Sequence, residues 1–194
     1  KHFVSKEAFN IDGLGKKIIE GFWKLKLISF PQDIFKLDYN KIETLEGWGK
    51  LSVENLKYSI NQKKTISLER FIFSLGIRHI GLENAKLLSK YFVSFSNFLN
   101  LSKKYNYDDL LNIDGIGETQ VGSIRSFFLN ELNIKVLNDL GKILTIKNSA
   151  EKQKNGLLKN KSFLVTGKLN GISRAEIKSL IEENSGSTLS TVSS

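Results

Sequence analysis

The sequence predicts a mostly α-helical fold, in which a compact helical domain of four repeated turn units is followed by a short β-α-β segment. Three observations predict it. A hydrophobic-x-Gly-hydrophobic-Gly pattern recurs at intervals of 34, 32 and 36 residues, with one departure described below. Apolar residues stand four and seven positions after each pattern, which is helical spacing. Towards the end of the chain, β-rich runs at 162–166 and 187–192 flank a helical pattern at 173–183.

The repeated patterns define turns 1 to 4, at residues 12–15, 46–49, 78–81 and 114–117. Glycine can adopt a positive φ and lets another backbone come close. The helix that begins after each turn presents free N–H groups and the positive end of its dipole, which suits a phosphate. We expect the middle residues of the turns to pack helix against helix: Leu14, Trp48, Ile80 and Ile116. The alternative is a helical solenoid in which the glycines only close turns.

This spacing resembles the helix-hairpin-helix motif, and the resemblance implies binding to the sugar-phosphate backbone of DNA without recognition of the bases. Cations follow the first two turns, as Lys16, Lys17 and Lys50, whereas Glu118 follows turn 4. Turn 3 departs from the pattern, because His79 stands where the first glycine belongs. Its hairpin geometry is therefore less certain from the sequence.

The remaining elements follow from apolar spacing, in chain order. The expected helices occupy residues 1–9, 16–27 and 31–35, a short stretch before turn 2, and then 50–61, 68–92 around turn 3, 93–106, 121–128 and 129–144. The first of the short helices after turn 1 begins at Pro31, whose fixed φ suits a first helical turn. A polar connector covers 61–65. Trp23 is expected to pack in the core or in an interface rather than to stack bases.

The stretch 68–92 closely resembles the third helix-hairpin-helix motif of bacterial NAD-dependent DNA ligases, and residues 3–15 resemble the first. The order and spacing of the four repeats resemble that family over residues 1–145. A linker is predicted at 146–156, since 147–156 holds one alanine and no other apolar residue. Residues 157–194 resemble the opening of a BRCT domain, which closes this ligase family, but the remaining strands and helices of that fold are absent from the sequence.

In phosphopeptide-binding BRCT domains a Thr/Ser-Gly pair lines a phosphate pocket. The resemblance therefore makes Thr166, Gly167 and Lys168 conceivable anion contacts. The simpler interpretation is that Thr166 and Gly167 end the first strand. A β-α-β order implies a parallel strand pair.

The ligase family adenylates a lysine in a Lys-x-Asp-Gly motif and takes the adenylate from NAD. Both Asp-Gly pairs of this chain follow an asparagine at the lysine position, Asn10 and Asn112, and asparagine has no nucleophilic amine. The resemblance thus implies no catalytic residue and no cofactor in this chain, which should be inactive alone. The family's NAD, divalent cation and structural zinc would be bound outside it, by the amino-terminal ligase domains.

Composition agrees with a polyanionic partner. The formal net charge is +9, and lysine supplies 25 of the 29 basic residues, which favours point-charge contact with phosphates over bidentate recognition of guanine. There is no cysteine, and the two histidines lack ligand spacing, so we expect no metal site. No stretch has the length of a membrane span and no signal-peptide pattern opens the chain, so we expect a cytoplasmic protein that binds neither a membrane nor a small-molecule substrate.

The predicted function is sequence-independent binding of duplex DNA, expected to be nicked, by the clamp portion of a nick-sealing NAD-dependent ligase of replication and repair. The expected contacts are the turns and nearby cations: Gly13, Gly15, Lys16, Lys17, Gly47, Gly49, Lys50, Arg78, His79, Gly81, Gly115, Gly117 and Arg125. For each lysine a plain solvated side chain is an equal alternative.

Two other classes of protein compete with this prediction. A helix-hairpin-helix glycosylase needs a catalytic aspartate in a Val-Asp-x-His-Val setting after the hairpin, whereas Asp139 is the only aspartate after Gly117 and has no histidine near it in the sequence. A stand-alone DNA-binding or scaffold protein of DNA repair is the other alternative. The ligase-like spacing of the repeats and the BRCT-like tail favour the ligase.

Overall fold

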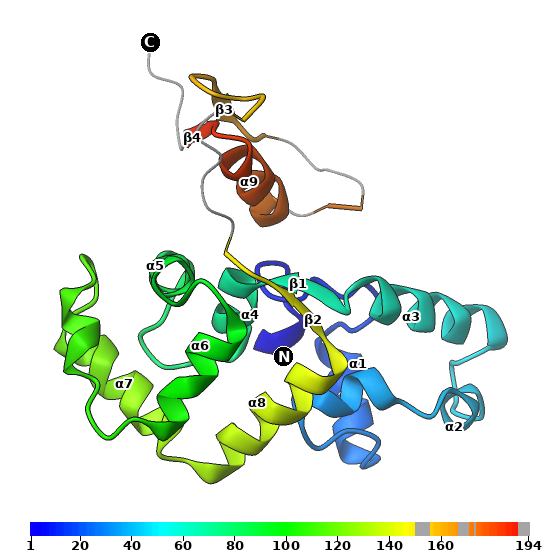
Figure 1. The fold of residues 1–194 in the computed structure, drawn as a ribbon. Coiled ribbons are helices and arrows are strands. Elements are labelled where there is room, and N and C mark those ends of the chain that lie inside the picture. Colours follow the sequence, from blue (N-terminus) through cyan, green and yellow to red (C-terminus); the bar gives the residue numbers. More distant parts are fainter. Residues whose placement is uncertain (150–155, 167–170, 173, 190–194) are drawn as a thin grey trace. The chain divides into compact units, whose positions relative to one another are not determined.

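The computed structural model describes residues 1–149, 156–166, 171–172 and 174–189 (Figure 1). The chain divides into two compact units, Lys1–Asn148 and Ser149–Ser194. Unit 1 holds all four turns. Within the described residues, no helix combines the length and apolar character that a membrane span requires.

Unit 1 is helical, as predicted, apart from two short strands. Its α-helices are α1 (Lys16–Lys24), α2 (Tyr39–Glu43), α3 (Lys50–Gln62), α4 (Leu68–Ser74), α5 (Leu82–Phe92), α6 (Phe95–Leu99), α7 (Glu118–Phe128) and α8 (Glu131–Ile143). Short 3₁₀ helices fill the gaps: η1 (His2–Val4), η2 (Pro31–Lys36), η3 (Asn100–Lys103) and η4 (Asp108–Asn112). The helix expected over residues 1–9 is only one 3₁₀ turn.

The apolar residues at helical spacing after each turn form the core of unit 1. The residues four positions on, Ile19, Val53, Ala85 and Val121, are all buried. So are the residues seven positions on, Phe22, Leu56, Leu88 and Ile124. The prediction that the same helix face recurs four times is therefore confirmed, and each turn is held at the start of a helix that is anchored in one shared core.

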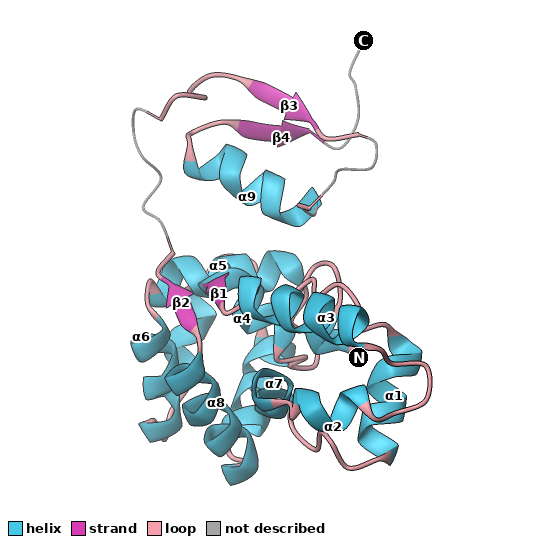
Figure 2. Ribbon diagram, turned by 90° about the vertical axis from the view of Figure 1, so that its right-hand side faces the viewer, coloured by secondary structure: helices cyan, strands magenta, loops and turns pink. Residues whose placement is uncertain are grey.

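Strands β1 (Thr65–Ser67) and β2 (Thr145–Lys147) were not predicted. They pair in parallel, with Ile66 opposite Ile146, and Figure 2 shows them side by side. Thr65 was expected at the end of a polar connector, and residues 146–147 in a linker. Those expectations are wrong in detail, because three-residue strands are too short to show an alternating pattern and the partners lie far apart in the sequence.

Unit 2 contains β3 (Ser162–Leu164), α9 (Arg174–Glu183) and β4 (Ser187–Leu189). Its two strands pair in parallel, as the β-α-β order predicts. On α9, Ile181 is buried, whereas Leu180 exposes 47% of its surface. Thr166 is exposed, while Gly167 and Lys168 lie outside the described residues.

Candidate nucleic-acid interface

The four turns have one backbone conformation. The residue at the first-glycine position has a φ of +84° in Gly13, +80° in Gly47, +61° in His79 and +88° in Gly115. In every turn the N–H of the following residue donates to the carbonyl three residues before it, at 3.4, 3.1, 3.1 and 2.9 Å in turns 1 to 4. Turn 3 thus has the same geometry as the others although it lacks the first glycine.

His79 accepts the left-handed conformation that glycine adopts freely elsewhere. Non-glycine residues enter this region at a cost, and histidine is among those that enter it more often. The Asn84 side chain supports the turn, since its Nδ2 donates to the His79 carbonyl oxygen at 3.0 Å. The sequence left the hairpin geometry of turn 3 uncertain because the first glycine is missing. The backbone conformation of His79 shows that the geometry is kept without that glycine.

A long helix begins directly after the second glycine of each turn. Gly15, Gly49, Gly81 and Gly117 are the N-cap residues of α1, α3, α5 and α7, and all four have extended backbone. Glycine has no side chain, so these positions provide no side-chain cap. Among the other α-helices of unit 1, α2, α6 and α8 begin with Asp38, Ser94 and Asn130, whose side chains accept a first-turn N–H, whereas Ser67 at the start of α4 makes no cap hydrogen bond. The four helices after the turns therefore keep first-turn N–H groups for an outside anion.

The glycine amides themselves differ among the turns. The Gly49 N–H donates to Ser52 Oγ at 2.9 Å, and the Gly117 N–H donates to Gln120 Oε1 at 3.1 Å. In turns 2 and 4 the second glycine's own amide is thus already engaged. An anion at these turns would bind the N–H groups that follow the glycine, at the start of the helix.

The two glycines of a turn have different roles. A Cβ at Gly13 or Gly115 would meet Leu56 at 3.6 Å or Leu87 at 2.9 Å, and both residues have positive φ. These first glycines provide a left-handed backbone, which His79 adopts in turn 3. A Cβ at Gly15, Gly49 or Gly81 would meet nothing within 4 Å, and these residues have φ values open to any residue. The second glycines instead leave open space in front of a helix N-terminus.

Cations are concentrated at turn 1. Lys16 and Lys17 are exposed on the first turn of α1. The turn 1 recess, of about 380 Å³, is lined by Lys1, Val4, Ser5, Lys6, Asn10, Ile11, Asp12, Gly13, Leu14, Gly15 and Lys16. It combines three lysines with both glycines and one carboxylate, Asp12, so turn 1 has the most cations of the four turns. At turn 2 the only predicted cation is Lys50, and at turn 3 it is Arg78, which stands beside His79. All three side chains are exposed.

Turn 4 is acidic. Asp114 lies in the turn and Glu118 opens α7, and both are exposed. Arg125, the cation predicted for this turn, pairs with Asp108 at 3.6 Å and lies over the Tyr107 ring at 5.9 Å. Burial raises the pKa of the Tyr107 hydroxyl, an effect that Arg125 partly opposes. Turn 4 therefore has the geometry of the other turns without their charge.

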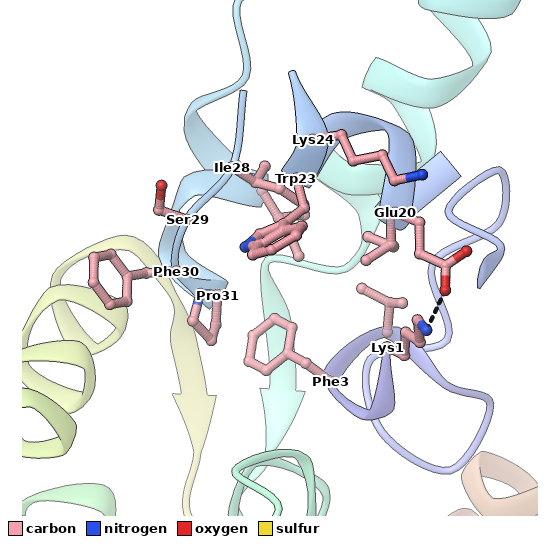
Figure 3. Close-up of a pocket in the computed structure, with 12 residues that line it drawn as sticks. Lys1, Phe3, Glu20, Trp23, Lys24, Ile28, Ser29, Phe30 and Pro31 are labelled. Atoms are coloured by element: carbon pink, nitrogen blue, oxygen red, sulfur yellow. Dashed lines mark hydrogen bonds and ion pairs between the residues drawn. The ribbon is translucent and has the colours of Figure 1, made fainter. Parts of the chain in front are cut away.

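A second hollow, the Trp23 cleft, lies beside turn 1. Its volume is about 720 Å³, and its lining comes from η1, α1 and the start of η2: Lys1, Phe3, Val4, Ile19, Glu20, Trp23, Lys24, Ile28, Ser29, Phe30, Pro31 and Ile34. Figure 3 shows the Trp23 indole within this cleft, across from Phe3 and Pro31. Trp23 exposes 65% of its surface, so it does not pack in the core, and packing in an interface stays a prediction.

Residues 70–137, which include turns 3 and 4, match the family of the helix-hairpin-helix motif. The chain is 67% identical over 192 residues to the DNA ligase of Pelagibacter ubique strain HTCC1062, covering 99% of this chain and 28% of that relative. The chain is homologous to part of a DNA ligase. It is also 47% identical to the DNA ligase of Wolbachia pipientis wMel, over 92% of the chain and 28% of the relative. The DNA ligase of Rickettsia bellii strain RML369-C is 41% identical over the whole chain and 30% of its own length.

The chain thus spans less than a third of the length of the DNA ligases it matches. The described residues include no group of three side chains that could hold a metal ion. Sequence analysis missed Lys1 and Lys6 of the turn 1 recess, since they precede the turn and follow no motif. Their closeness to turn 1 in the sequence was the only available signal.

Proposed function

We propose that this chain is the DNA-holding portion of an NAD-dependent DNA ligase that seals nicks in the cytoplasm during replication and repair. In this proposal turns 1 to 4 belong to four tandem helix-hairpin-helix motifs. They bind the backbone of double-stranded, nicked DNA from the minor-groove side without reading its sequence. The adenylation and sealing steps belong to amino-terminal ligase domains, because neither Asp-Gly pair here follows a lysine.

One observation carries the proposal: at three turns the second glycine leaves open space in front of a helix N-terminus that has no side-chain cap. A fold that used glycine only to close the turn would need it where φ is positive, which is the first position. The second glycine has negative φ and no neighbour at Gly15, Gly49 and Gly81. A phosphate that approaches the first-turn N–H groups explains both the missing side chain and the missing cap.

The tail is part of the same proposal. We infer that residues 157–194 begin a BRCT domain, and that the linker before it starts only after β2 ends at Lys147. The parallel pairing of β3 with β4 around α9 supports this inference. Relatives named DNA ligase align with nearly the whole chain, tail included, and this favours the ligase over a stand-alone DNA-binding or scaffold protein.

The test is fluorescence anisotropy of a labelled nicked duplex, titrated with the chain over a series of salt concentrations. We expect a dissociation constant on the order of 10⁻⁶ M or weaker at physiological salt, equal for a duplex of scrambled sequence. The logarithm of the affinity should fall by about 0.9 per phosphate neutralised for each unit of log salt. An affinity that does not change with salt concentration, or no binding at low salt, would refute backbone recognition.

A substitution pair links the binding to the turns. Gly49→Val puts a branched side chain into the open space at turn 2, and we expect it to weaken binding to all duplexes about tenfold, as the loss of one charged hydrogen bond does. Gly122→Ala is the matched control, because Gly122 lies inside α7, where a Cβ also meets nothing within 4 Å. Equal affinities for the two variants would mean that the turns are only structural.

A further inference from the structure

The Trp23 cleft is a feature of unit 1 that backbone binding leaves unexplained. Trp23 comes from α1, the helix that begins at turn 1, and most of its indole surface is open to solvent. Beneath it Phe3 is buried and stacks on Phe9, with ring centroids 4.3 Å apart. The cleft is therefore lined by a buried aromatic ring, Phe3, and an exposed aromatic ring, Trp23. Its volume of about 720 Å³ lies within the range of ordinary ligand pockets, roughly 300–1,000 Å³.

The polar groups of the cleft gather on one side. Figure 3 shows the head groups of Lys1, Glu20 and Lys24 grouped on one side of the indole, with Pro31 on the other. Lys1 Nζ donates a hydrogen bond to Glu20. This bond, with the charges of Lys1 and Lys24, holds the pKa of the Glu20 carboxyl below its ordinary value. A flat ring in the cleft could therefore stack on the Trp23 indole, with the donors of Lys1 and Lys24 and the acceptor Glu20 on one side.

The Trp23 cleft adjoins the turn 1 recess. Lys1 and Val4 line both hollows, so the two lie side by side. Along α1 the indole is seven residues beyond Lys16, about 10 Å at the helical rise of 1.5 Å per residue. An aromatic cleft thus lies next to the most basic of the four turns.

We propose that the Trp23 cleft receives an unpaired nucleobase of the DNA strand whose phosphate is held at turn 1. The inference rests on the proposed function and extends it from duplex backbone to a frayed or displaced nucleotide. Stacking on an exposed aromatic ring is tolerant of base identity, because every base has a π-face. The lysines of the adjoining recess favour a ligand whose flat apolar part is joined to a phosphate, and this distinguishes a nucleotide from an apolar peptide segment.

The test compares two probes, a fully paired nicked duplex and the same duplex with a short unpaired thymidine flap at the nick. We expect the chain to prefer the flap duplex by at least about fivefold, the lower limit for one stacked base. The flap duplex should also quench tryptophan fluorescence. Trp23→Phe should keep much of the preference and lose the quenching, since Trp48 is the only other tryptophan and lies outside the cleft.

Trp23→Ala should abolish the preference for the flap while leaving the affinity for the paired duplex and its salt dependence unchanged. Tyr58→Ala is the matched control, because Tyr58 is equally exposed on α3 and lines neither hollow. Equal binding of both probes by the parent chain, or a flap preference that survives Trp23→Ala, would overturn the inference. The inference would also be overturned if a different segment of the ligase changed the tryptophan fluorescence of the chain while the flap duplex did not. Failure to bind either probe would instead refute the proposed function.

Discussion

The two glycine positions of a turn have different roles, the first in folding and the second in binding. Gly115 has a φ of +88°, and a Cβ there would come within 2.9 Å of Leu87 Cδ1. Gly81 has a φ of −82°, and a Cβ there would meet nothing within 4 Å. Glycine thus stands at the two positions of one motif for two different reasons. The first is the need for a left-handed backbone, and the second is the need for empty space in front of a helix.

We expect Gly115→Ala to lower the free energy of unfolding by about 1–2 kcal/mol, the cost of a left-handed conformation for a residue with a Cβ. Gly81→Ala should leave it within about 0.5 kcal/mol or raise it slightly, because alanine restricts the unfolded chain. Urea unfolding followed by far-UV circular dichroism measures both. Two equal changes in stability would show that the distinction between the glycines is wrong.

The sequence was sufficient for the glycines but not for His79 or Trp23. A motif records residue types, and His79 differs in type while its backbone has the conformation of the glycines it replaces. Trp23 lies at helical spacing among apolar residues, so its pattern is that of a core residue. Its exposure follows from what lies opposite it, an open cleft bounded by the distant Phe3 and Pro31, and no local pattern contains that information.

The helices that follow the turns begin with the same backbone geometry but differ in the charge of their first residues. α1 opens with Lys16 and Lys17, α3 with Lys50, and α7 with Glu118. A carboxylate at a helix N-terminus is favourable within the chain, since it opposes the positive end of the dipole. The same carboxylate repels a phosphate that approaches the same N–H groups. Turn 4 should therefore contribute least to DNA binding, although its backbone fits.

We expect Glu118→Lys to strengthen binding to any duplex several-fold and to steepen the salt dependence by up to about 0.9, the value for one added phosphate contact. Glu131→Lys makes the same charge change at the first residue of α8, which Asn130 caps and which follows no turn. Anisotropy titrations at several salt concentrations compare the two variants. If both strengthen binding equally, net charge and not the turn is responsible.

Elements were predictable where a long periodic pattern existed and not where pairing was distant. The helices after the turns, and α8, follow from apolar spacing over several helical turns. β1 and β2 have three residues each and are held together by a parallel ladder between segments about 80 residues apart, Thr65–Ser67 and Thr145–Lys147. Strands of that length have no sequence signal of their own, so only the completed core brings them together.

The β1–β2 pair connects the end of unit 1 to its middle. Thr145 N–H donates to the Lys64 carbonyl at 2.9 Å, and Ile146 packs against the core opposite Ile66. Arg70, buried on α4, likewise donates to the carbonyls of Lys6 and Ala8 in the segment before turn 1. The repeats are thus joined into one body by contacts that lie outside the turns, and binding by several turns depends on them.

This arrangement predicts how shortened chains behave. A chain of residues 1–148 keeps all four turns and both strands of unit 1, so we expect it to retain the cooperative unfolding and the duplex affinity of the whole chain. A chain of residues 1–144 loses β2, with its ladder and the packing of Ile146. Its free energy of unfolding should fall by about 2–4 kcal/mol, from a few net hydrogen bonds and one half-buried isoleucine.

Thermal unfolding and anisotropy on the nicked duplex, measured on the three chains, check this prediction. Because residues 151–194 hold seven basic and four acidic residues, removing them takes away a small positive charge, and the salt dependence should change little if the turns do the binding. A large loss of affinity in the 1–148 chain would place DNA contacts in unit 2 and not in the turns. An unchanged stability of the 1–144 chain would show that the β1–β2 pair does not help to hold the repeats together.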